Sequence, residues 1–105
     1  MVLLCTAKMR DNYRKYGSVV RLVKFSNFIN SRSPTTTIIY FIGQDCSAKM
    51  VLFGVLLLKW ECYENYREGF QYFFTIMGHA PKVIIRERDS GCKDMIVKAI
   101  LDVGK

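Results

Sequence analysis

Acidic side chains that could hold a catalytic metal ion are unevenly spread along this 105-residue sequence. Two-metal phosphoryl-transfer sites bind Mg²⁺ or Mn²⁺ through carboxylates on neighbouring strands, because these hard ions prefer oxygen ligands. The segment RERD supplies two such residues, Glu87 and Asp89. From Asn12 to Gln44 the chain has no Asp or Glu at all. A strand that ends in RERD could therefore supply acidic ligands to such a site, whereas a strand between residues 12 and 44 could not.

Cysteine and histidine offer no alternative chemistry. Cys5, Cys46, Cys62 and Cys92 lie far apart, and His79 is the single histidine, so the ligand spacing of a zinc site is missing. Nothing in the sequence ties a particular Ser or Cys to His79 as a nucleophile. We interpret the cysteines as core thiols of a protein in a reducing compartment, and we predict no metal site.

Basic residues gather in the N-terminal third of the chain. The first 33 positions hold seven Lys and Arg residues against one acidic residue, Asp11, in a chain whose net charge is +7. A basic patch of this kind attracts polyanions, most commonly nucleic acid. The candidate nucleic-acid-binding residues are Lys8, Arg10, Arg14, Lys15, Arg21 and Lys24. The alternative is a solvated basic surface, because no aromatic stacking platform is evident beside these charges.

Hydrophobic periodicity predicts one small α/β domain with helices and strands in a definite order. The expected elements are a helix at 6–16, strands at 18–25, 35–43 and 50–59, a helix at 62–77, a strand at 83–86, and a helix from about Gly91. The longest apolar run, 50–58, is too short to span a bilayer, and the opening MVLLC is too short for a signal sequence. We therefore expect no membrane contact and no secretion.

Aromatic residues at helical spacing mark the helix at 62–77. They recur at steps of three and four residues, which predicts a stripe that packs on a sheet in preference to a cofactor site: Tyr63, Tyr66, Phe70, Phe73 and Met77. Gly78 follows directly and is suited to end the helix. By the same reasoning the last helix, capped by Asp89 or Ser90, has a core face of Cys92, Ile96, Ala99, Ile100 and Val103.

Several short motifs then occur in register between residues 41 and 96. The first is an F-x-G strand end at Phe41 and Gly43, and the second is a strand reading L-F-G at Leu52, Phe53 and Gly54. The third is an acidic residue, Glu61, before a helix that contains Phe70. The fourth is a P-x-x-I-I strand that begins at Pro81 and is followed by acids, including Asp89. This pattern resembles the core of the transposases of Mutator-like elements (MULE) and of the far-red-response transcription factors of plants derived from them. The upstream segment DNYRKYGSVV is similar to the family's Y-x-x-F-G-D-V segment.

The resemblance implies a fold and a function. The fold is a ribonuclease H-like core, βββαβα, truncated before its fifth strand, which makes 1–105 a single partial domain with a helical lead-in at 1–17 and the core at 18–105. The implied function is DNA transposition in the nucleus, with DNA as a partner. Such transposases use Mg²⁺ or Mn²⁺ held by three acidic residues.

This sequence departs from the family's pattern of acidic residues. The first falls on Val23, and the second falls on Glu87, while Asp89 keeps the neighbouring acid of the motif. A Glu in place of Asp shifts the ion by about one methylene, and a misplacement near 1 Å can lose on the order of 10²-fold in rate. The third position lies beyond residue 105. We therefore expect a catalytically inactive chain that needs no cofactor.

Three interpretations remain open. The first is a fragment or degenerate relative of a MULE transposase. The second is a non-enzymatic basic module that binds nucleic acid or protein. The third keeps activity, with the missing carboxylates supplied by a longer transposase copy. In the first, the outer edge of the strand at 83–86 would lack a neighbour, and we expect self-association there.

Overall fold

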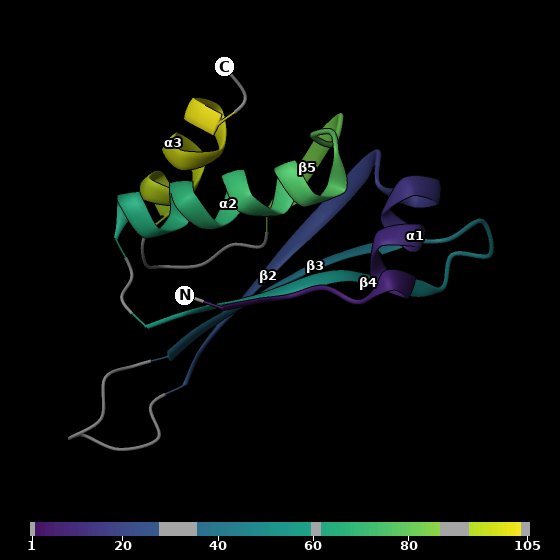
Figure 1. Cartoon of the computed structure of the whole chain (residues 1–105), viewed down its shortest axis with the longest axis horizontal. Coiled ribbons are helices and arrows are strands. Elements are labelled where there is room, and N and C mark those ends of the chain that lie inside the picture. The colour runs from purple at the N-terminus through teal and green to yellow at the C-terminus, as the bar shows by residue number, and fades with distance from the viewer. Residues whose placement is uncertain (1, 28–35, 60–61, 87–92, 104–105) are drawn as a thin grey trace.

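The computed structural model describes residues 2–27, 36–59, 62–86 and 93–103, which form a mixed α/β domain (Figure 1). Its elements are β1 (Val2–Leu4), α1 (Ala7–Tyr16), β2 (Val19–Asn27), β3 (Thr36–Gln44), β4 (Met50–Leu58), α2 (Tyr63–Met77), β5 (Val83–Arg86) and α3 (Lys93–Val103). All seven expected elements are present, with bounds within two residues of the expected ones. The α/β class is confirmed.

The five strands form one mixed sheet in the order β1-β4-β3-β2-β5. Neighbouring strands are antiparallel except β2 and β5, which are parallel, in a register that runs from the pair Val19 and Val83 to the pair Leu22 and Arg86. In the ribonuclease H arrangement that the resemblance implies, the strand at 83–86 is expected beside the strand at 18–25 and parallel to it, and β5 and β2 pair in this way. Two segments more than sixty residues apart in sequence therefore meet at one side of the sheet.

Helix α1 is fixed by its two ends. The Thr6 hydroxyl accepts a hydrogen bond from the Met9 backbone N–H at 3.1 Å, which satisfies one of the unpaired donors of the first turn. Gly17 ends the helix, but its φ of −80° is open to any residue. Glycine is needed there because an added Cβ would lie 2.3 Å from the Tyr13 carbonyl oxygen and 2.7 Å from its ring.

Helix α2 packs its aromatic stripe on the sheet, as predicted. Tyr66, Phe70 and Phe73 are fully buried, and the two ends of the stripe are partly buried against the same core. Gly78 adopts the left-handed conformation with φ of 89°, and its N–H donates to the Phe74 carbonyl at 2.9 Å. Glycine takes this conformation without the steric cost that other residues meet, which explains the helix end.

Strands β3 and β4 form an antiparallel hairpin, and their motif glycines have a steric explanation. The Phe41 ring stacks on the Phe73 ring of α2, with centroids 3.9 Å apart and planes at 8°. A Cβ on Gly54, which pairs with Phe41, would lie 2.9 Å from the Phe73 ring. A Cβ on Gly43 would lie 2.5 Å from the ring of Phe53. Both glycines therefore leave room for aromatic rings of the core.

The two faces of the sheet are covered differently. Helices α2 and α3 lie on one side, where Val20, Leu22 and Ile39 are buried (Figure 1). Helix α1 packs against β4 and α2 on the same side, because the Tyr13 ring contacts Phe53 and Phe73. In the described part of the chain no helix covers the opposite side, which we call the open face and define by Val19, Arg21, Ile42, Gln44, Met50 and Ile85.

Strand β1 was not predicted. It has three residues and pairs antiparallel with β4, from Val2 opposite Leu57 to Leu4 opposite Val55. Three residues are too few to show an alternating pattern, and the pairing depends on a partner more than fifty residues away. The sheet consequently has an additional strand at the β4 edge, and the predicted edge strand, β5, lies at the other.

Helix α3 closes the end of the core beside α2. Ala99 is buried, and Ile100 and Val103 are partly buried against the core, as expected. The Tyr63 hydroxyl of α2 donates to the Asp102 carboxylate of α3, which ties the two helices together. The other expected features of this region lie outside the described residues: the helix start near Gly91, the caps Asp89 and Ser90, Cys92, and the side chain of Ile96.

Candidate functional site

The two positions that the resemblance assigns to the first and second acids follow neighbouring strands. Leu22 of β2 and Arg86 of β5 form the last pair of the parallel register. Val23 comes directly after Leu22, and Glu87 comes directly after Arg86 in the sequence. Glu87 and Asp89 themselves lie outside the described residues. The strands that carry the first and second acid positions are therefore adjacent, and the described pairing stops one residue before both positions.

The described residue that pairs with Val23 is not acidic. Val23 is half-buried and pairs with Tyr40 of β3, so neither residue of this pair supplies a carboxylate. Over the described ranges, no group of three or more His, Cys, Asp or Glu side chains could hold a metal. A hard divalent cation requires several oxygen ligands, and among the described residues none is supplied at this end of β2 by a carboxylate.

Four of the six candidate cations lie together on α1. Lys8, Arg10, Arg14 and Lys15 are all exposed. Asp11 pairs with Lys15 at 3.1 Å and with Arg14 at 2.6 Å. Hydrogen bonds from Lys15 and then Arg14 hold the pKa of the Asp11 carboxyl below its usual range. Because one carboxylate serves two cations, the helix keeps a net positive surface.

Tyr13 anchors this basic helix to the core. It is buried, and its ring lies edge-on to Phe53 and Phe73, with centroids 5.3 and 5.4 Å away. Its hydroxyl donates to the His79 carbonyl at 2.9 Å. Burial raises the pKa of Tyr13 to about 12. The rings and the hydrogen bond together set the position of α1 relative to the end of α2.

A surface hollow of about 350 Å³ lies between α1 and the segment that ends α2. It is lined by Ala7, Arg10, Asp11, Arg14, Ile76, Met77 and His79. Arg10 and Arg14 can each donate hydrogen bonds to an anion, as can the His79 ring. Sequence reasoning missed His79 as part of this surface, because GHAP is typical of a turn and the contact with α1 depends on the fold.

The two remaining candidates, Arg21 and Lys24, lie on β2, whereas α1 packs against β4 and α2. Arg21 is exposed on the open face, whereas α1 packs on the opposite side of the sheet. Lys24 is half-buried, and strand alternation places it on the same side as Val20 and Leu22. The structure therefore brings together four of the six residues that the sequence grouped.

Comparison of the chain with protein-family models, with curated proteins and with solved structures finds no match. Among the helices of the described residues, none has the length and apolar character required to cross a membrane.

Proposed function

We propose that this chain is a catalytically inactive relative of MULE transposases, with a ribonuclease H-like core, and that it associates with DNA in the nucleus. The observation that carries the proposal is the pairing of β5 with β2. Two antiparallel pairings join β2, β3 and β4, a helix follows, and the next strand returns to lie parallel to β2. This is the order that the resemblance implies.

The acid positions support the same proposal. In a transposase of this class the first and second acids hold the same metal ions, so their strands must be neighbours. Leu22 and Arg86 are paired, and they directly precede Val23 and Glu87. The motif residues also have structural roles: Gly43 and Gly54 face aromatic rings of the core. A relative that has lost the first acid but keeps the fold would be expected to be inactive.

Helix α1 is the proposed DNA contact. Its cations are exposed, close together, and held against the core by Tyr13. Lys and Arg act on DNA chiefly by displacing counterions from phosphates, which gives affinity without sequence preference. The hollow beside Arg10 and Arg14 would accept a backbone phosphate.

Anisotropy of a labelled DNA duplex over a salt series tests this DNA contact. Wild-type affinity should fall steeply with salt, with a slope in log Kd against log salt of about 0.9 per phosphate contacted. The variant Arg10→Glu with Arg14→Glu should bind much more weakly. Arg67→Glu with Lys98→Glu changes the net charge equally at exposed positions of α2 and α3 and serves as the control. Equal losses of DNA affinity in the two variants would show that only the net charge matters and that α1 is not the contact.

The second candidate is a nucleic-acid or protein-binding module without kinship to transposases. The basic helix favours it, because that surface needs none of the acid positions. A third candidate retains activity through carboxylates from a longer transposase copy. Calorimetry with Mn²⁺ separates the third from the others, because acids kept for shared catalysis should give the isolated chain measurable affinity for the ion.

A further inference from the structure

The open face of the sheet is apolar and exposed. Met50 is 74% exposed, Val19 is 43% exposed and Ile85 is 42% exposed. Strands β3 and β4 read as nearly continuous apolar runs, a pattern typical of strands that are covered on both faces. Exposed apolar surface that extends over several strands marks a binding site in soluble proteins.

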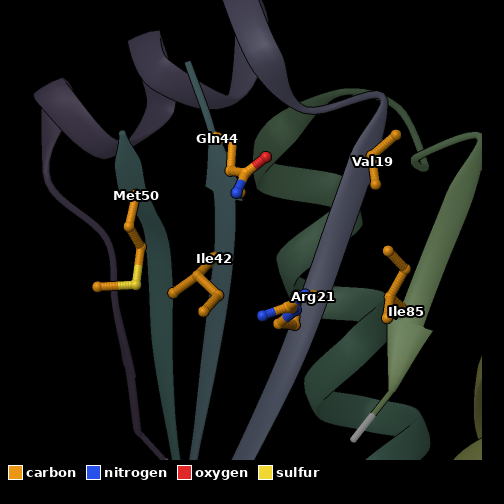
Figure 2. Close-up of a pocket in the computed structure, with 7 residues that line it drawn as sticks. Val19, Arg21, Ile42, Gln44, Met50 and Ile85 are labelled. Atoms are coloured by element: carbon orange, nitrogen blue, oxygen red, sulfur yellow. The ribbon is translucent and has the colours of Figure 1, made fainter. Parts of the chain in front are cut away.

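A shallow hollow of about 150 Å³ lies in this face, lined by Val19, Arg21, Ile42, Gly43, Gln44, Met50 and Ile85 (Figure 2). These residues come from β5, β2, β3 and β4. Figure 2 shows their side chains on the strands, with α2 passing behind the sheet. Neighbouring strands lie about 4.8 Å apart, so four strands span roughly 14 Å. That width accommodates one α-helix, whose diameter with side chains is about 10–12 Å.

Charge decides what can cover this hollow. Among the described residues that line it, Arg21 alone is charged. No ion pair between two described residues involves Arg21. An apolar cover without an acid would bury this guanidinium unpaired, which is costly. A second copy of the chain would bring a further Arg21 and another net charge of +7.

We propose that the open face binds an amphipathic helix of a different polypeptide, whose apolar side chains fill the hollow and whose Asp or Glu pairs with Arg21. Helix on sheet is a stable layer arrangement, and an amphipathic helix can present an apolar stripe with a carboxylate in it. A guanidinium can bind that carboxylate through two parallel hydrogen bonds. This inference stands independently of the DNA contact on α1.

Selection from a displayed library of helical peptides tests the proposal. The library varies the residues of one helix stripe, and it is screened against the wild-type chain and, in parallel, against Arg21→Glu. Peptides enriched on the wild type should carry apolar residues with one Asp or Glu in the stripe. Peptides enriched on Arg21→Glu should carry Lys or Arg at that position. Circular dichroism confirms that both proteins are folded.

The best wild-type peptide is then titrated against variants. Met50→Asp should weaken its binding at least tenfold, whereas Leu101→Asp, at a 63% exposed residue of α3, should leave it unchanged. The proposal is overturned if the peptides enriched on the wild type show no preference for Asp or Glu in the stripe. It is equally overturned if the best peptide binds the wild type and Arg21→Glu with the same affinity. It is also overturned if the chain sediments as a dimer that Met50→Asp dissociates, because a second copy would then occupy the face.

Discussion

Adding one methyl group at Gly43 should destabilise the domain through Phe53. The new Cβ would lie 2.5 Å from both the Cε2 and the Cζ atoms of Phe53, and 3.2 Å from the Val19 carbonyl oxygen. Phe53 has no exposed surface, and its ring is held edge-on by Tyr13 at 5.3 Å. The ring therefore cannot withdraw without disturbing its neighbours. Overpacking of this kind costs about 1–3 kcal/mol of unfolding free energy.

A double-mutant cycle isolates the contact. Phe53→Leu alone removes buried ring atoms, which costs on the order of 1–2 kcal/mol, but it also opens space for a Cβ at Gly43. The double variant Gly43→Ala with Phe53→Leu should therefore lose less stability than the sum of the single variants, by about 1 kcal/mol or more. Urea unfolding followed by circular dichroism measures each free energy.

Gly78→Ala is the matched control for this cycle. A Cβ there meets no atom within 4 Å, but φ is 89°, so the substitution costs about 1–2 kcal/mol through backbone conformation alone. Its cost should add to that of Phe53→Leu. If the Gly43 cycle is also additive to within about 0.5 kcal/mol, the ring does not press on Gly43 and the steric explanation of the motif is wrong.

Three further predictions concern the core, the chemistry and the sheet edge. Tyr13→Phe should cost about 1 kcal/mol by removing the hydrogen bond to His79. The raised pKa of Tyr13 makes the folded state hold its proton more tightly, so stability should be constant below about pH 10, fall towards pH 12, and fall less in Tyr13→Phe. No metal-dependent nicking of duplex DNA is expected from the wild type or from Val23→Asp with Glu87→Asp, and a nicked product on a gel would contradict this. Self-association through the β5 edge should decrease in Val83→Lys, and unchanged sedimentation coefficients over a concentration series would exclude that edge.

The elements best predicted from sequence are those with a long local pattern. The stripe from Tyr63 to Met77 repeats at helical spacing over about four turns. Its three central residues, Tyr66, Phe70 and Phe73, are buried where the pattern places them. Strand β5 was predicted from a short apolar run after Pro81, and its partner came from the resemblance. In both cases the pattern that predicts the element lies within one short stretch of sequence.

Features that depend on distant contacts could not be predicted. Strand β1 exists through its pairing with β4, and its three residues carry no pattern of their own. The six candidate cations are close in sequence, but strand alternation places Arg21 on the open face, and Lys24 lies on β2, whereas α1 packs against β4 and α2. The exposed state of the open face was also unforeseen, because Ile42 and Met50 belong to runs that are typical of buried strands.

The central proposal is that β2 and β5 bring together the two positions that the resemblance assigns to metal-binding acids. Mn²⁺ affinity, measured by water proton relaxation, tests it in two variants. Val23→Asp with Glu87→Asp should bind Mn²⁺ at least tenfold more tightly than Val19→Asp with Glu87→Asp, which adds the same charge elsewhere on the same strand. Two carboxylates at the end of the β2 and β5 pair can share an ion, whereas one placed at Val19 cannot. Equal affinities in the two variants would contradict the claim.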